Sequence, residues 1–244
     1  TFAYEKERPI LKQISLSAKK GDFVAIVGES GCGKSTLASI FTGKNRNYQG
    51  EVLFGGAQGV PLAEISEESL LEQITYVGHA GYLFRGTVRE NLLLAKPDGT
   101  DEEFWQVLEQ MKLADFLRSE QGLDTMLAEK GSNFSGGQCQ RLVMARALLH
   151  DSAVYIFDEA TSNIDAESEN DIMEQIYQMK GKKTVLLISH RLANVTAADK
   201  IYVLEQGKIA EQGNHETLIT QNGSYAKLWN TQQKLEDYRK EKAS

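Results

Sequence analysis

The length, composition and charge of the chain exclude several classes of protein. Its 244 residues are 41% hydrophobic and 25% charged, close to the globular average, so the chain can build one large or two small hydrophobic cores. Its 27 Lys and Arg and 34 Asp and Glu give a net charge of -7, which disfavours a coat on nucleic acid or an anionic bilayer, and no apolar run reaches the roughly 18 to 20 residues of a membrane-spanning helix.

Strand-like and helix-like segments alternate along the chain. Short apolar runs predict strands over residues 23–27, 74–77, 154–157, 184–188, 201–204 and 208–211. These runs are apolar on both faces, as in a covered parallel sheet. Helical spacing predicts helices over residues 34–42, 87–95, 101–111 and 136–149. With Asp101 as the expected N-cap of the third helix, the pattern predicts an α/β fold with an inserted helical subdomain.

A glycine-rich segment connects the first of these strands to the first helix. It satisfies the phosphate-loop pattern G-x-x-x-x-G-K-[ST] with Gly28, Glu29, Ser30, Gly31, Cys32, Gly33, Lys34, Ser35 and Thr36. The glycines let backbone N–H groups turn toward phosphate oxygens, and the helix N-terminus adds partial positive charge. We therefore expect Lys34 to reach the β- and γ-phosphates of a nucleotide and Ser35 to bind Mg²⁺.

The two cysteines, Cys32 and Cys139, lie far apart in the sequence. This spacing indicates neither a disulfide framework nor a zinc site and suits a reducing, cytosolic compartment. Cys32 stands beside a helix N-terminus and Lys34, so its thiol is expected to have a lowered pKa.

Two acidic residues, Asp158 and Glu159, follow the buried run 154–157. Ligands of open α/β sheets bind at the carboxyl ends of such strands. We expect Asp158 to hold Mg²⁺ and Glu159 to act as the general base on an attacking water. Acid pairs after a strand also serve as plain helix caps, but the phosphate loop upstream favours the catalytic role.

Further motifs resemble those of the ABC (ATP-binding cassette) ATPases. Residues 133–138, Asn-Phe-Ser-Gly-Gly-Gln, resemble the LSGGQ signature with Phe in place of Leu, and residues 141–148 resemble the helix that follows it, although Cys139 stands where Arg is usual. Tyr4 resembles the aromatic residue that stacks on adenine. Residues 162–165, Ser-Asn-Ile-Asp, resemble the D-loop, and His190 after Ser189 resembles the switch histidine.

This resemblance, which spans Tyr4 to about Ile219, implies a fold, cofactors and partners. The fold is a P-loop NTPase core with a mainly parallel sheet, an N-terminal antiparallel β portion and an inserted α-helical subdomain. The implied division is an ATP-binding core (1–84 and 151–223), a helical signature subdomain (85–150) and a C-terminal helical tail (224–244). The cofactors are ATP and Mg²⁺. In the family two such domains dimerise head-to-tail, so that the signature of one faces the phosphate loop of the other.

The same resemblance assigns roles to the residues of the later motifs. A helix N-terminus with a hydroxyl and free N–H groups makes an anion site, here formed by Ser135, Gly136, Gly137 and Gln138. Asp165 would contact the nucleotide from the D-loop, and His190 would contact the γ-phosphate.

Smaller features resemble the exporter branch of the family. Residues 127–131 resemble the exporter X-loop, residues 86–91 resemble the stretch after an exporter Q-loop, and His190-Arg191-Leu192 replaces the His-Asp pair frequent in importers. The resemblance implies an upstream transmembrane domain, which would explain the start at Thr1, and a place on the cytoplasmic side of the cell membrane, the isolated chain being soluble. A nucleic-acid partner is not expected, and the mixed-charge helix over residues 225–242 is interpreted as solvated packing.

One residue departs from the family pattern. His79 aligns with the Q-loop glutamine that contacts Mg²⁺ and water, and a neutral imidazole can accept or ligate through one nitrogen. Retained ATPase activity, with His79 as a metal ligand and catalytic group, is favoured because Lys34, Asp158, Glu159 and His190 are present. The alternatives are a partly degenerate half of a heterodimeric exporter, a separately encoded importer subunit, a non-catalytic nucleotide-binding module and a non-transport ABC ATPase.

Overall fold

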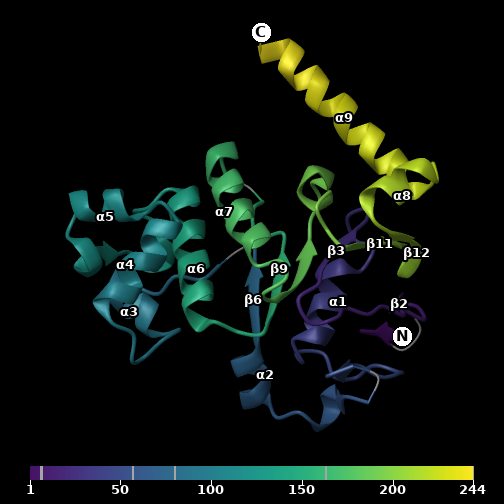
Figure 1. Ribbon diagram of the computed structural model, residues 1–244, viewed down its shortest axis with the longest axis horizontal. Coiled ribbons are helices and arrows are strands. Elements are labelled where there is room, and N and C mark those ends of the chain that lie inside the picture. The colour runs from purple at the N-terminus through teal and green to yellow at the C-terminus, as the bar shows by residue number, and fades with distance from the viewer. Residues whose placement is uncertain (6–7, 57, 80, 163, 244) are drawn as a thin grey trace. The chain divides into compact units, whose positions relative to one another are not determined.

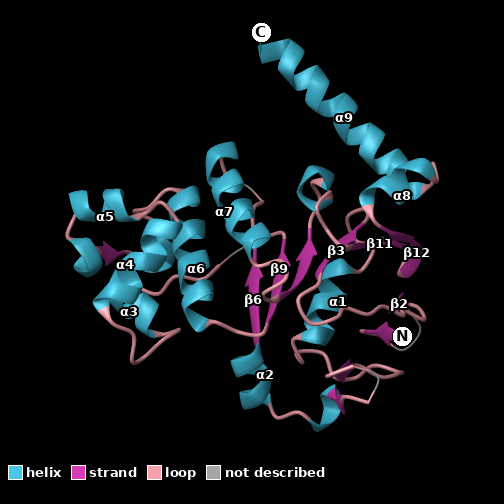
Figure 2. Ribbon diagram, in the orientation of Figure 1, coloured by secondary structure: helices cyan, strands magenta, loops and turns pink. Residues whose placement is uncertain are grey.

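The described part of the chain divides into two units. The structure is a computed structural model, and the residues it describes are 1–5, 8–56, 58–79, 81–162 and 164–243. One unit comprises Thr1–Leu71 and Lys180–Ser244, and the other comprises Glu72–Met179. Figure 1 traces the chain and Figure 2 shows its helices and strands. Both units contain helices and strands, which confirms the predicted α/β class. The expected boundaries at residues 85, 151 and 224 stay predictions.

The first unit contains a parallel sheet with one antiparallel strand. Strand β3 (Phe23–Val27) pairs in parallel with β10 (Thr184–Ile188) and β11 (Lys200–Glu205), and β12 (Lys208–Gly213) pairs with β11 in antiparallel orientation. All five residues of β3 are buried, as its continuous apolar sequence predicts. Burial alternates along β12 instead. The prediction of cover on both faces of β12 is wrong, because one face of this terminal hairpin meets solvent.

Short antiparallel pairs and helices complete the first unit. The pairs are β1 (Phe2–Ala3) with β2 (Pro9–Leu11) and β4 (Leu53–Phe54) with β5 (Val60–Pro61). They confirm the expected N-terminal antiparallel portion. The helices are α1 (Lys34–Phe41), α8 (His215–Thr220), α9 (Ser224–Ala243) and the greater part of α2 (Glu67–Gln73), with the 3₁₀ turns η1 (Leu62–Glu64) and η4 (Leu192–Val195).

The second unit is mainly helical. Its helices are α3 (Val88–Leu93), α4 (Asp101–Gln110), α5 (Ala114–Ser119), α6 (Gly136–His150) and α7 (Ala166–Gln178), with the 3₁₀ turns η2 (Gly122–Asp124) and η3 (Glu129–Gly131). Its strands are β6 (Ile74–Gly78) and β9 (Val154–Asp158), which are parallel, and β7 (Gly86–Thr87) and β8 (Met126–Leu127), which are antiparallel. Helix α4 packs on α6, and Phe104 and Leu108 of α4 and Leu142 of α6 are all buried. All the predicted helices are confirmed, whereas α2, α5, α7 and α8 are helices that the sequence analysis does not predict.

A capping box fixes the start of α4 and corrects one prediction. The N-cap is Thr100, whose hydroxyl accepts the N–H of Glu103 at 3.3 Å, while the Glu103 carboxylate accepts the N–H of Thr100 at 3.0 Å. Asp101, the predicted cap, is the first residue inside the helix. Its carboxylate turns to Arg89 instead. Thr100 rather than Asp101 is the N-cap because Thr100 has the extended backbone conformation that an N-cap needs.

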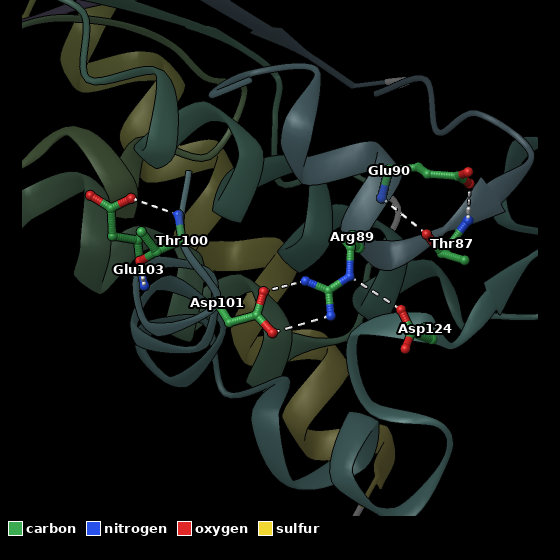
Figure 3. Close-up of polar contacts among 7 residues, drawn as sticks. All are labelled: Thr87, Arg89, Glu90, Thr100, Asp101, Glu103 and Asp124. Carbon is green, nitrogen blue, oxygen red and sulfur yellow. Dashed lines mark hydrogen bonds and ion pairs between the residues drawn. The ribbon is translucent and has the colours of Figure 1, made fainter. Parts of the chain in front are cut away.

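Helix α3 begins with a second capping box, and its first turn carries an arginine that forms ion pairs (Figure 3). Thr87 accepts the N–H of Glu90 at 3.0 Å, and Glu90 accepts the N–H of Thr87 at 2.7 Å. From the first turn of this helix, Arg89 donates to Asp101 and, at 3.2 Å, to Asp124 in η2. One guanidinium thus joins α3, the start of α4 and the turn that precedes β8.

Candidate functional site

The glycine-rich segment forms a tight loop between β3 and α1. Gly28 has φ 148° and Gly33, the N-cap of α1, has φ 111°. A Cβ on Gly28 would collide with the carbonyl oxygen of Leu204, and a Cβ on Gly33 would lie 2.8 Å from a methyl carbon of Leu11. Both positions therefore require glycine for their conformation and for space. The loop ends at a helix N-terminus, which is the geometry that binds phosphate groups.

Lys34 is held inside this loop. Its side chain is 4% exposed, and its Nζ donates to the carbonyl oxygens of Gly28 and Glu29 at 2.9 Å each. Among the residues that the structure describes, no carboxylate forms an ion pair with Lys34. Its described hydrogen-bond partners, the two carbonyl oxygens and at 3.9 Å the Cys32 sulfur, carry no formal charge, and an anion in the loop would compensate its positive charge.

The expectation for Cys32 is wrong. This residue is buried, and burial raises the pKa of its thiol, even though the positive charge of Lys34 lowers that pKa to a smaller extent. Desolvation disfavours a thiolate more than the neighbouring cation favours it. Cys32 is thus a small packed residue in the loop rather than an activated nucleophile.

Tyr4 presents an exposed ring that is tethered to α1. The residue is 62% exposed, and its hydroxyl accepts a hydrogen bond from the Nδ2 atom of Asn45 at 3.3 Å. The same Nδ2 atom donates to Ser39 Oγ on α1 at 2.6 Å, and Phe2 packs edge-on against the tyrosine ring. The ring face is accessible for stacking on a base. Sequence reasoning missed Asn45, which no motif marks.

His190 leaves the sheet at the same edge as the phosphate loop. In the parallel pair of β10 and β3, Ile188 lies opposite Ile26, and the N–H of Ser189 donates to the Ile26 carbonyl at 3.4 Å. Two residues beyond Ile26 comes Gly28, and two residues beyond Ile188 comes His190. The histidine is exposed. The first unit therefore brings Tyr4, the loop and His190 to one set of neighbouring elements.

His79 and the acid pair Asp158-Glu159 lie at the carboxyl ends of the parallel strands β6 and β9. Strands β6 and β9 are in parallel register with Gly78 opposite Asp158, so His79 and Glu159 are the first residues after the two strands. Asp158 is 5% exposed, Glu159 is half-buried and His79 is exposed. Glu159 has φ 55°, an uncommon left-handed conformation for a side chain of this size. Such strained positions cluster at functional sites.

Tyr76 holds the carboxylate of Asp158. Its hydroxyl donates to Asp158 Oδ2 at 3.1 Å. Burial of the phenol, the negative charge of Asp158 and the hydrogen bond raise the pKa of Tyr76 to about 12. The phenol therefore stays protonated and remains a donor to the carboxylate. Sequence reasoning did not single out Tyr76, since an aromatic residue in a strand carries no specific signal.

The oxygen atoms of the Asp158 carboxylate suit Mg²⁺ better than a transition metal. Among the described residues, no three His, Cys, Asp or Glu side chains gather where they could hold a metal. Mg²⁺ needs no such cluster, because it takes one or two protein carboxylates and completes its shell with phosphate and water oxygens. The buried carboxylate of Asp158 has the chemistry that such a ligand needs.

The signature segment forms the N-terminus of α6. Ser135 is the N-cap, and its hydroxyl accepts the N–H of Gln138 at 3.1 Å, while the Gln138 side chain accepts the N–H of Ser135 at 2.8 Å. The hydroxyl keeps its own hydrogen for donation, and the N–H groups of Gly136 and Gly137 belong to the first turn, which has no acceptor inside the helix. The predicted anion site therefore has a physical basis in α6.

Asp165 has a structural partner that the sequence did not reveal. It is the N-cap of α7, and its carboxylate accepts the N–H and the hydroxyl of Ser168 at 2.8 and 2.7 Å. These two hydrogen bonds lower the pKa of Asp165. A Cβ on Gly137 would collide with Ser168, so the signature helix packs closely against this cap. Asn163 of the predicted D-loop lies outside the described residues.

Comparison with known families identifies the chain. The profile of the family described as ABC transporter matches residues 11–162, more than half of the chain. The chain belongs to the ABC transporter family. This confirms the resemblance that the phosphate loop and the signature indicate.

Relatives in the ABC transporter family are longer proteins. An uncharacterised ABC transporter ATP-binding protein of Haemophilus influenzae is 48% identical over 98% of this chain and 42% of its own length. The ATP-dependent lipid A-core flippase of Haemophilus ducreyi is 41% identical, over 95% of this chain and 40% of its own length. A solved bacterial Atm1-family ABC exporter with ATP bound is 34% identical over 95% of this chain and 40% of its own, with a TM-score of 0.88. The chain thus spans less than half the length of each of these three relatives.

The predicted site residues of this ABC domain are distributed over both units. The first unit holds Tyr4, the loop 28–36 and His190, and the second holds His79, Asp158, Glu159, the signature and Asp165. Among the described residues, none of the helices combines the length and the apolar composition needed to cross a membrane.

Proposed function

We propose that this chain is the ATP-hydrolysing domain of an ABC exporter. The observation that carries the proposal is the Asp158-Glu159 pair at the end of β9, in a chain whose phosphate loop is complete. The similarity of 95% of the chain to an exporter with ATP bound supports it.

Under this proposal, each predicted site residue of the first unit has a role in ATP binding. The exposed ring of Tyr4 stacks on adenine, and the N–H groups of residues 28–36 together with Lys34 bind the phosphates. The hydroxyl of Ser35 is a Mg²⁺ ligand. His190 donates a hydrogen bond to the γ-phosphate and stabilises the charge that develops there.

In the second unit, Glu159 accepts a proton from the attacking water. Asp158 is the carboxylate ligand of Mg²⁺, and His79 takes the place of the family's glutamine beside the ion. The ion would neutralise the charge of the phosphate oxygens when it is bound. Tyr76 keeps the Asp158 carboxylate in one orientation through its hydrogen bond. Catalysis of this kind is mainly positioning and charge stabilisation.

The signature implies a second ABC domain as partner. The N–H groups of Gly136 and Gly137 and the hydroxyl of Ser135 would bind the γ-phosphate of ATP held by the partner's phosphate loop, so that the two domains close head-to-tail on two Mg-ATP. Hydrolysis would reopen the dimer and drive a transmembrane domain on the cytoplasmic side of a membrane. Relatives named as flippase and as multidrug export proteins support the exporter role.

His79 motivates the alternative function. In a heterodimeric exporter one site can be partly degenerate, and an imidazole in place of the glutamine is a departure of that kind. Glu159 and Lys34 favour an active site instead, because a site that no longer hydrolyses ATP has no need of a general base. A separately encoded importer subunit remains the other alternative.

Replacement of Glu159 tests the proposal. The wild-type chain should release phosphate from Mg-ATP, whereas Glu159→Gln should lose at least about a hundredfold in kcat, since general-base catalysis contributes this much. ATP should remain bound, so size-exclusion chromatography with Mg-ATP should show a dimer of the variant. Glu167→Gln, an exposed glutamate in the first turn of α7, is the matched control and should behave as wild type. Unchanged turnover in Glu159→Gln would refute the role of this residue.

A further inference from the structure

The C-terminal helix α9 contacts the loop that carries His190. From this helix, Gln232 accepts a hydrogen bond from the N–H of Leu192 at 2.9 Å through its Oε1 atom. Its Nε2 atom donates to the carbonyl oxygen of His190. One side chain thus bridges the main chain on both sides of Arg191, from a position 42 residues after His190 in the sequence.

Ser189 and Arg191 also form hydrogen bonds within this loop and to β3. The N–H of Ser189 donates to the Ile26 carbonyl, the N–H of Arg191 donates to Ser189 Oγ at 3.0 Å, and Ser189 Oγ donates to the Arg191 carbonyl at 3.1 Å. The His190 carbonyl and the Leu192 N–H bond to Gln232 of α9. The loop is therefore anchored at one end to the strand that leads into the phosphate loop and at the other end to Gln232.

We infer that Gln232 is a positioning residue for His190, an inference that rests on the proposed function. The exposed imidazole of His190 is carried by this main chain, so the conformation of the main chain contributes to the direction of the ring. A carboxamide has one acceptor and one donor group, which match the N–H of Leu192 and the carbonyl of His190. By fixing both groups, Gln232 holds His190 in the direction from which it can reach a γ-phosphate.

The effect expected from losing this bridge is on turnover rather than on ATP affinity. Under the proposed function the phosphate loop and Tyr4 supply most of the contacts to ATP, whereas the hydrogen bond from His190 acts mainly on the charge that develops at the γ-phosphate during hydrolysis. Small misplacements of a catalytic group lower the rate of the chemical step by one or two orders of magnitude. We therefore expect about a tenfold lower kcat, with a KM for ATP within about twofold of wild type.

The chain offers a matched control beside Gln232. The next residue, Gln233, is also a half-buried glutamine of α9, and its side chain makes no hydrogen bond to other described residues. The experiment compares Gln232→Leu and Gln233→Leu with the wild-type chain. Leucine has nearly the same size as glutamine but neither donates nor accepts. Phosphate release gives kcat and KM, and hydrogen–deuterium exchange without nucleotide reports on the N–H of Leu192.

The expected result is a tenfold loss of kcat and faster exchange at Leu192 in Gln232→Leu, with wild-type values in Gln233→Leu. Wild-type kcat in Gln232→Leu, or an equal loss in Gln233→Leu, overturns the inference. A parallel rise of KM also overturns it, because that result indicates a general structural role. A wild-type chain that releases no phosphate refutes the proposed function and the inference together. An active wild type with an unaffected Gln232→Leu refutes the inference alone.

Discussion

A buried carboxylate in the second unit supports a quantitative prediction. Asp171 on α7 is paired with Arg141 on α6 at 2.7 Å and with Lys112, just after α4, at 2.6 Å. The exposed fractions of these side chains are 7% for Asp171, 14% for Arg141 and 58% for Lys112. Asp171→Ala would therefore leave one nearly buried cation and one exposed cation without their partner.

The two cations contribute very different amounts to the cost. Lys112 can return to water, so its pair is worth no more than about 1 kcal/mol. Arg141 cannot, and its Nε is already buried without a partner among the described residues. Breaking a buried pair costs about 3–5 kcal/mol, and the partial exposure of Arg141 favours the lower end. We expect Asp171→Ala to destabilise the domain by about 3 kcal/mol. For a domain of this size this lowers Tm by about 6–12 °C.

Thermal and urea unfolding of three variants test this reasoning. Asp115→Ala is the matched control, since Asp115 is a fully exposed partner of Arg118 in the same unit, and its loss should change stability by less than about 0.5 kcal/mol. Replacing both members of the buried pair, as in Asp171→Leu with Arg141→Leu, should recover most of the stability, because apolar residues of similar volume need no compensation. Equal losses in Asp171→Ala and Asp115→Ala would show that burial of Arg141 does not determine the cost.

Three further predictions concern the proposed site. Lys34→Ala should weaken ATP binding by at least about tenfold in a titration calorimeter, because the loop loses its cation, and wild-type affinity would contradict the phosphate-loop role. His79→Gln restores the family's glutamine and should keep or raise kcat at neutral pH, whereas a large loss would show that the imidazole has a role of its own. The hydrogen bonds from Ser168 lower the pKa of Asp165. The stability that the Asp165 carboxylate contributes is therefore present above a pH of about 4 and is lost as the pH falls through the lowered pKa. Urea midpoints of Asp165→Asn should therefore fall less than those of wild type between pH 5 and pH 3.

The parts of the site that sequence predicts well are contiguous in the chain. The phosphate loop lies between a strand and a helix whose periodicity is clear, and the Asp158-Glu159 pair directly follows an apolar run. In both cases a local pattern determines the conformation, and the chemistry assigned to the residues stays a prediction. The family resemblance added His190 and the signature, which are equally local motifs.

The contacts that sequence could not predict join distant segments. Tyr76 reaches Asp158 across 82 residues, and Asn45 reaches Tyr4 across 41. No periodicity links such residues, since their contact depends on strand register and on the packing of α1. The pKa of Cys32 was mispredicted for the same reason, because burial is a property of the folded loop and not of its sequence.

Side-chain amides that bridge main-chain groups recur around the loops of this domain. Asn91 accepts from the N–H of Phe84 and donates to its carbonyl, both at 2.9 Å, and Asn133 accepts from the N–H of Ala128 and donates to the carbonyl of Met126, also at 2.9 Å. Their partners are main-chain groups that every sequence contains, so a sequence can indicate the amide but not the loop it holds. Gln232 makes the same pair of bonds from α9. An ionised carboxylate of similar size could only accept, and leucine could make neither bond of a bridge. The requirement for both a donor and an acceptor therefore explains the amide at all three positions.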